Sequence, residues 1–387
     1  MFRSLTLKKI VVVLFLTISL ACKQKENAGA LNVPMNEQPE IKHAKGFSIE
    51  RTVSGITIVK ISSPWPKAET SFTYALVPRA LASSISLDKE VFDAIIPVPV
   101  NSIVVTSTTH IPALEALGVE DRLVGFPDTQ YISSEKTRKR ITDGLVKELG
   151  NNEAMNTEMV IELRPDLVVG FSINNQNRVY ETLQHSNIRV VYNGDWTEET
   201  PLGKAEWIKF FAPFFGKETA AKGIFDSIEK SYLATRDLAR TATSTPTVLS
   251  GALYKDIWYL PGGKSWAAQF LADANAKYLW ANTEETGSLS LSWESILDTA
   301  QHADFWVGPA QFTSYNDLQD ANTHYTQFDA FKNKHAYTFA KTTGATGGLL
   351  YYELAPHRPD IVLKDLIHIL HPELLPDHQL YFFKPLD

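Results

Sequence analysis

Cysteine is nearly absent from this chain of 387 residues, in which Cys22 is the only one. A single cysteine cannot form a disulfide within the chain, and it cannot supply the thiolates of a cysteine-based metal site. The one cysteine lies close to the start of the chain, where another use has to be considered.

An excess of positive charge is missing as well. The chain has 37 Lys and Arg against 44 Asp and Glu, which gives a net charge of −7. It also lacks a stripe of basic residues with aromatic residues between them, the pattern typical of nucleic-acid binding. We therefore expect no nucleic-acid partner.

The apolar run near the N-terminus is too short to span a membrane. It reads IVVVLFLTISLA at residues 10–21 and has 12 residues, whereas a spanning helix needs about 20. Basic residues precede it and small residues end it, so residues 1–21 are typical of a secretory signal peptide. The sequence ISLAC resembles a bacterial lipobox, although Ser19 stands where Leu is usual. We predict lipidation at Cys22; the alternative is an ordinary cleaved signal with an incidental cysteine.

Two segments of different composition follow the signal peptide. Residues 22–44 are polar and have no apolar periodicity, which suits a flexible tether between a membrane and a folded body. Residues 45–99 alternate apolar and polar side chains around Gly55, which predicts a hairpin, and a third strand is expected after Pro64 and Pro66. We interpret this segment as a small antiparallel β extension.

Two stretches of alternating strands and helices follow, at residues 100–200 and 242–387. Such alternation predicts mostly parallel sheets covered by helices on both faces, and hence two doubly wound α/β lobes. The stretch between them, 201–241, has no strand pattern. Its apolar residues after Lys217 recur at helical spacing and predict one helix of about 24 residues, roughly 36 Å long, which could join the lobes.

The two lobes contain a matching pair of segments. NTEMVIELRPDLVVG (156–170) and SWESILDTAQHADFWVG (292–308) each read as a helix, a turn and a buried strand, and they set Glu158 opposite Glu294. A carboxylate in the first turn of a helix is stabilising by about 0.3–1 kcal/mol, which would explain either Glu alone. In two lobes related by pseudo-symmetry, however, matching positions project from the same face on either side of a cleft.

Several segments together resemble one family. NSIVVTSTTHIPALEALGVEDRLVGF, NTEMVIELRPDLVVG, PLGKAEWIKFFAPFFGKE and PDIVLKDLIHILHPELLP are similar to the substrate-binding proteins of iron-siderophore and vitamin B12 ABC importers, over roughly residues 100–387. The resemblance implies the class III periplasmic-binding fold, in which one long helix joins two lobes and the ligand lies between them. It also implies that one surface Glu of each lobe, here Glu158 and Glu294, docks onto Arg residues of the permease. The 45–99 extension lies outside this resemblance.

Ligand contacts are expected in the loops at the carboxyl ends of the strands. Aromatic side chains there would suit a corrin, a haem or an iron chelate, and the alternative is that several of them pack inside their own lobe. Tyr254 and Trp258 are favoured because they follow the first strand of the second lobe. The candidate residues are Thr108, Thr109, His110, Tyr131, Trp196, Tyr254, Trp258 and Ser288.

Other kinds of site find less support. A bare-metal site at His110 would need about four converging ligands, and His368 and His371 lie in the terminal helical segment. PGGKS (261–265) lacks the first Gly of a phosphate-binding loop, because Trp258 occupies that position. GATGGLL (344–350) is interpreted as a mobile loop. We expect no metal site, no cofactor and no catalytic residues.

Together these patterns predict a monomeric lipoprotein, anchored in the periplasm or at the cell surface by its lipid. It would capture a siderophore-like iron chelate and deliver it to an ABC permease. Cobalamin or haem is the alternative ligand within the family, and a secreted enzyme on a two-lobed α/β scaffold is the alternative from another class.

Overall fold

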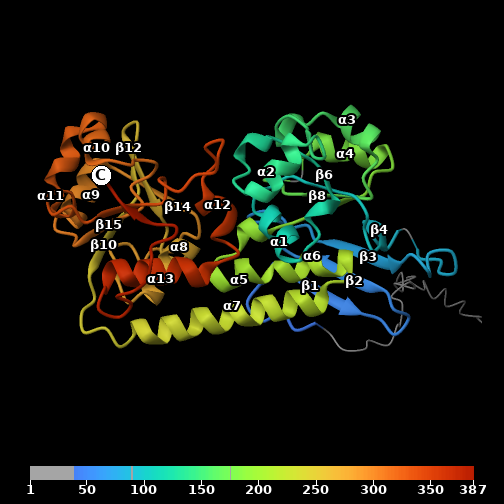
Figure 1. Ribbon diagram of the computed structural model, residues 1–387, viewed down its shortest axis with the longest axis horizontal. Coiled ribbons are helices and arrows are strands. Elements are labelled where there is room, and N and C mark those ends of the chain that lie inside the picture. Colours follow the sequence, from blue (N-terminus) through green and yellow to red (C-terminus); the bar gives the residue numbers. More distant parts are fainter. Residues whose placement is uncertain (1–38, 89, 175) are drawn as a thin grey trace, which may run out of the picture. The chain divides into compact units, whose positions relative to one another are not determined.

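The computed structural model describes residues 39–88, 90–174 and 176–387 (Figure 1). The predicted signal peptide and Cys22 lie outside these residues. Within them, no helix combines the length and the apolar character that a membrane crossing requires.

The N-terminal sheet has four strands in the order β1-β2-β3-β4. The predicted hairpin turns at Gly55, which has a φ of +81°, and the third strand follows the two prolines. The fourth strand was not predicted, and it pairs in parallel with the third, so the extension is a mixed rather than an antiparallel sheet. The strands are β1 (Phe47–Arg51), β2 (Thr57–Ile61), β3 (Phe72–Pro78) and β4 (Ala94–Val98).

This sheet shares one core with lobe one. Its buried residues Phe47, Val59 and Tyr74 belong to the same apolar cluster as Ile103 of lobe one and Phe210 of the helical connection. The N-terminal sheet is therefore packed as part of lobe one, and a small second cluster around Ala75 and Val77 is its own.

Lobe one is built on a parallel sheet in the order β7-β6-β5-β8-β9. The residues of β5, β8 and β9 are all buried, as expected for strands covered on both faces. The strands are β5 (Ile103–Val105), β6 (Leu123–Phe126), β7 (Lys147–Glu148), β8 (Leu167–Gly170) and β9 (Val190–Tyr192), and the helices are α1 (His110–Ala116), α2 (Glu135–Thr142), α3 (Thr157–Leu163) and α4 (Arg178–His185).

Lobe two has a second five-stranded sheet in the order β13-β10-β15-β16-β17, parallel except for its last pair. Its strands are β10 (Thr247–Ser250), β13 (Lys277–Tyr278), β15 (Phe305–Val307), β16 (Ala336–Thr338) and β17 (Lys384–Pro385). Its helices are α8 (Trp266–Asp273), α9 (Trp293–Ala300), α10 (Tyr315–Ala321), α11 (Asp329–Lys332), α12 (Leu350–Leu354) and α13 (Pro359–Leu370).

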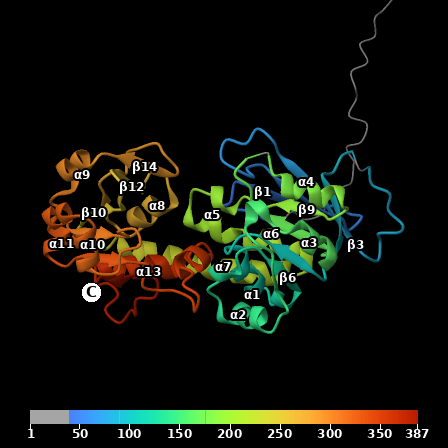
Figure 2. The ribbon, with the colours of Figure 1, turned by 90° about the horizontal axis from the view of Figure 1, so that it is seen from above.

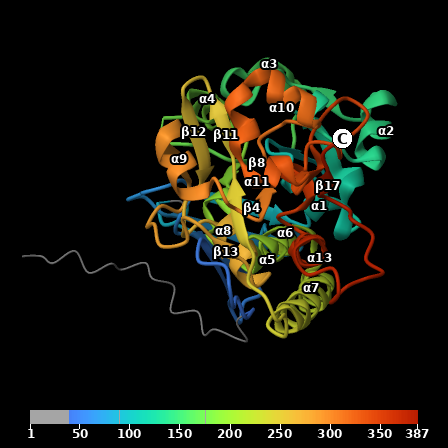
Figure 3. The same cartoon turned by 90° about the vertical axis from the view of Figure 1, so that its left-hand side faces the viewer.

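The first strand of lobe two ends earlier than the pattern TVLSGAL suggests. Gly251 has a φ of +78°, and a Cβ there would lie 1.9 Å from the carbonyl oxygen of Tyr259. The chain therefore turns at this glycine and enters a separate antiparallel sheet, β11-β12-β14. Figure 2 labels β12 and β14 of this sheet, and Figure 3 labels β11 and β12. Its strands are β11 (Ala252–Tyr254), β12 (Ile257–Pro261) and β14 (Ser288–Leu291).

One long helix joins the lobes. The connection consists of α5 (Pro201–Glu206), α6 (Ile208–Phe215) and α7 (Glu218–Ala239), and α7 has 22 residues. Phe225 of α7 is packed in the core of lobe one, whereas Tyr232 and Ala239 belong to the core of lobe two. Helix α7 lies beside α6 and α13 (Figures 1 and 3). This arrangement confirms the predicted fold class.

Four strands of each main sheet match in order, and β7 and β17 are extra edge strands. The order β6-β5-β8-β9 in lobe one corresponds to β13-β10-β15-β16 in lobe two. Helix α3 precedes β8, and α9 precedes the equivalent strand β15. The sequence match between the two segments is thus also a structural match.

Candidate functional site

A cavity with a volume of about 1280 Å³ has residues of both lobes in its wall. Lobe two contributes the β11–β12 hairpin, helix α8 and part of α12. The other side is formed by residues 196–199 and by residues 45–46, 63 and 65–68 of the N-terminal region. Small-molecule sites commonly measure about 300–1,000 Å³, so this cavity has room for a large ligand.

Aromatic side chains dominate the cavity wall. Trp266 stacks on Tyr351 with ring centroids 5.7 Å apart, and Phe339 stacks on the same Tyr351 at 4.7 Å. The wall rings that are exposed, such as Tyr259 at 40% and Tyr352 at 51%, offer a flat or conjugated ligand an apolar contact area. The aromatic residues of the wall are Trp65, Trp196, Tyr254, Tyr259, Trp266, Phe270, Phe312, Phe339, Tyr351, Tyr352 and Phe383.

Three of the predicted ligand residues line this cavity. Trp196 and Tyr254 are 38% and 66% exposed, and Ser288 begins β14 at the edge of the small sheet. Their contact with a ligand stays a prediction, and their position suits it.

Trp258 does not line the cavity. It is completely buried in lobe two, where its indole N–H donates to the carbonyl oxygen of Ser250 at 2.9 Å and its ring stacks on Trp306. Along β12 the side chains alternate, so Trp258 and Leu260 are buried while Ile257 and Tyr259 are exposed. Tyr259, which was not predicted, therefore lines the cavity in place of its neighbour Trp258. The alternation of side chains along a strand is the pattern in the sequence that could have indicated this.

The candidates that follow β5 also lie outside the cavity wall. Thr109 donates to Asp195 Oδ2 at 2.7 Å, and Thr108 is partly buried. His110 is completely buried beside Phe211, and burial lowers its pKa to about 4, so the imidazole is neutral at pH 7. Among the described residues, no group of three or more His, Cys, Asp or Glu side chains is arranged to hold a metal ion.

Glu158 and Glu294 each occupy the second position of their helix. Asn156 caps α3 through the N–H of Met159 at 3.0 Å, and Ser292 caps α9 through the N–H of Ser295 at 3.3 Å. Both glutamates are exposed. The two helices thus present their carboxylates in the same local geometry.

Comparison with known proteins identifies the family. Residues 103–343 match the sequence profile of the family described as periplasmic binding protein. The chain belongs to the periplasmic binding protein family. As a member it has a solute-binding role, which agrees with a cavity between two lobes.

Other proteins share part of the sequence or the fold of this binding protein. An uncharacterised lipoprotein of Methanocaldococcus jannaschii is 26% identical over 298 residues, which cover 75% of this chain and 69% of the relative. A periplasmic haem-binding protein from Pseudomonas aeruginosa has a similar structure, with a TM-score of 0.56 at 18% identity, covering 74% of this chain and 98% of that one. A possible iron-binding, periplasmic solute-binding protein from Staphylococcus epidermidis gives a TM-score of 0.55 at 18% identity, covering 70% and 99%. These two structures show that the fold is shared.

The lobes of the binding protein also contact each other directly, through the loop that was interpreted as mobile. A Cβ on Gly344 would lie 2.5 Å from Ser133 Cα, and one on Gly348 would lie 2.3 Å from the carbonyl oxygen of Tyr131. Ser133 Oγ donates to the carbonyl oxygen of Gly348 at 3.0 Å, and Thr346 Oγ1 donates to that of Gln130 at 2.7 Å. The glycines are therefore required by a close approach of backbone to backbone, and Tyr131 belongs to this contact.

A buried carboxylate completes the contact. Glu353 on α12 is 2% exposed, and it accepts hydrogen bonds from the backbone N–H groups of Ser133 at 2.5 Å and Ser134 at 3.0 Å. Burial raises the pKa of Glu353 to about 7, and the two N–H donors offset only part of that effect.

Glu353→Ala is expected to lower the free energy of unfolding by about 1–3 kcal/mol, because two buried N–H groups lose their acceptor.

The stability of the wild type should also depend on pH. Since the folded protein holds the proton of the Glu353 carboxyl group more tightly than the unfolded chain does, the free energy of unfolding should fall as the pH rises from about 4.5 to about 7. Glu353→Gln, which cannot ionise, should flatten that part of the pH profile. Denaturant unfolding at several pH values measures both effects, with the exposed Glu135→Gln as control; equal slopes for the wild type and Glu353→Gln would contradict this role.

Proposed function

We propose that this binding protein captures a siderophore-like iron chelate and delivers it to an ABC permease, and that it is not an enzyme. The observation that carries the proposal is the aromatic cavity between the lobes, whose size and exposed rings suit a bulky, conjugated metal chelate. The name of the haem-binding structure is consistent with a ligand of this general kind.

We also propose that the protein acts while it is attached to a membrane. Lipidation at Cys22 would supply the anchor, and the naming of the Methanocaldococcus relative as a lipoprotein supports it. In the proposed mechanism, lobe closure is small because α7 is packed in the cores of both lobes. Glu158 and Glu294 would dock onto Arg residues of the permease, which then separates the lobes.

The test is a titration followed by tryptophan fluorescence. Trp65, Trp196 and Trp266 line the cavity, so a bound metal chelate should quench the emission in a saturable way. A ferric siderophore, haemin and cobalamin are compared, and each mixture is analysed for conversion of the probe. Saturable quenching without conversion by the ferric siderophore supports the proposal. Conversion of a probe, or quenching by none of the three, overturns it.

Trp196→Ala should weaken binding of the quenching chelate about tenfold, which corresponds to ~1.4 kcal/mol. The indole is partly exposed at the cavity wall, so its removal reduces the contact area for the ligand without creating a cavity in a hydrophobic core. Tyr381→Ala is the matched control, because Tyr381 is also an exposed aromatic residue, at 42%, but lies outside the cavity wall. Equal affinities for Trp196→Ala and the wild type would remove Trp196 from the site.

A further inference from the structure

The N-terminal region lies outside residues 103–343, which match the family, and yet it forms part of the cavity wall. Its contribution consists of Lys45 and Gly46 just before β1 and of the loop after β2, namely Ser63, Trp65, Pro66, Lys67 and Ala68. This wall faces residues of lobe two, such as Tyr254 and Trp266 on the other side of the same cavity.

The loop after β2 is held firmly on lobe one. A Cβ on Gly194 would lie 2.2 Å from the carbonyl oxygen of Ser63, and Thr197 Oγ1 donates to that same oxygen at 3.1 Å. The Trp65 ring packs edge-on against Phe72 and Tyr192 at 5.9 and 5.7 Å. The loop is therefore a preformed surface of the cavity.

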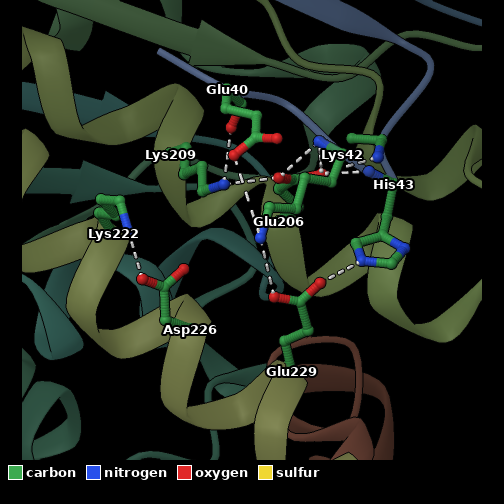
Figure 4. Close-up of polar contacts among 9 residues, drawn as sticks. Glu40, Lys42, His43, Glu206, Lys209, Lys222, Asp226 and Glu229 are labelled. Atoms are coloured by element: carbon green, nitrogen blue, oxygen red, sulfur yellow. Dashed lines mark hydrogen bonds and ion pairs between the residues drawn. The ribbon is translucent and has the colours of Figure 1, made fainter. Parts of the chain in front are cut away.

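The arm that leads into β1 is fixed as firmly (Figure 4). Glu206 accepts hydrogen bonds from the backbone N–H groups of Lys42, His43 and Ala44, at 2.7–3.0 Å. Glu198 accepts from the N–H groups of Lys45 and Gly46, both at 2.8 Å. Two carboxylates of lobe one and its connection thus position the arm against the cavity.

Among the residues that the structure describes, not every charged side chain of the cavity wall has a partner of opposite charge. Four charged residues line the cavity: Lys45, Lys67, Glu198 and Glu199. Glu198 is buried and also accepts from the Trp207 indole N–H at 3.0 Å, and Lys45 pairs with Glu199 at 3.5 Å. Lys67 is exposed, and within the described chain it has no acidic partner. The lobe-two side of the cavity contributes no charged residue.

We propose that the N-terminal sheet is a component of the binding site and that Lys67 selects ligands that carry an anionic group. This inference rests on the proposed function, since it concerns the same cavity. An anionic substituent placed beside Lys67 would gain a charge-assisted contact, whereas an uncharged chelate of similar size would gain only the apolar contacts.

Two pairs of probes test the selection, each pair differing in charge but little in shape. One pair is haemin, with its two propionate carboxylates, and haemin dimethyl ester, which has none. The other is a ferric tris-catecholate chelate, which is anionic, and a ferric tris-hydroxamate chelate, which is neutral. Affinities are measured by tryptophan quenching for the wild type, Lys67→Glu and Lys147→Glu. Lys147 is an exposed lysine of β7 that lies outside the cavity wall. Lys147→Glu therefore changes the net charge by the same amount as Lys67→Glu without changing the cavity.

Lys67→Glu should weaken binding of the anionic member of a pair about tenfold and leave the neutral member within about twofold, which corresponds to a shift of ~1.4 kcal/mol for the anion alone. Lys147→Glu should change neither, and added salt should reduce the difference. Equal losses for both members, or no loss for either, would overturn the selection by Lys67 while leaving the proposed function intact. Absence of quenching by every probe in the wild type would overturn the proposed function and this inference with it.

Discussion

Uptake of the chelate is expected to be abolished when Glu158 and Glu294 are both replaced by alanine, while the affinity for the ligand stays unchanged. Each carboxylate is exposed at the second position of a capped helix, and the two helices precede equivalent strands of the two sheets. A permease with approximate two-fold symmetry would meet two matching carboxylates, each able to accept a bidentate Arg. Uptake of a labelled ferric chelate by cells that carry the permease measures the loss, and quenching measures the affinity.

The same helices supply a matched control. Glu162 and Asp298 are exposed, lie one turn further along α3 and α9, and also correspond to each other. Their double alanine variant removes the same charge and should transport normally. Normal uptake by the Glu158/Glu294 variant would show that docking uses other residues, and a fall in its ligand affinity would place these glutamates at the ligand instead.

The largest effect on stability is expected for Glu206→Ala, at about 3–5 kcal/mol lower free energy of unfolding. Glu206 is completely buried, accepts three backbone N–H groups of the arm, and pairs with Lys209 at 2.6 Å (Figure 4). Removing it leaves the three N–H groups without their acceptor, and, among the described residues, it leaves a nearly buried ammonium group with only the carbonyl oxygen of Glu40, at 2.9 Å. Denaturant unfolding followed by tryptophan fluorescence gives the free energy.

Two further variants separate the causes. Lys209→Met combined with Glu206→Ala should recover part of the loss, because the unpaired charge is then gone as well. Glu199→Ala breaks an exposed ion pair with Lys45 and should cost less than about 1 kcal/mol. A loss below that value for Glu206→Ala would mean that the arm is held by other contacts.

Elements with a clear period could be predicted from the sequence. The apolar spacing after Lys217 predicted a helix of about 24 residues, and α7 has 22. The matching of Glu158 with Glu294 was visible in the residue pattern and reappears as the matching of α3 and α9. Local periodicity carries this information because it reflects which face of each element is buried.

The cavity wall could be predicted only in part. Trp258 was chosen because it follows the first strand, but the turn at Gly251 starts a new sheet in which Trp258 faces the core. The contact of Glu353 with Ser133 joins residues 220 positions apart. Such juxtapositions depend on how whole elements pack, and no local pattern records them.

The position of the arm would have a mechanical consequence if the predicted lipid anchor holds the chain at Cys22. The predicted tether extends to residue 44, but residues 42–44 are already bound by Glu206 on α5. A force on the tether would therefore act first on the contact between residues 42–44 and Glu206, in the helical connection between the lobes. The first cavity residue, Lys45, follows this attachment in the chain, and the exposed ends of α3 and α9 lie on other elements, so tension on the tether would reach Glu206 before it reached them.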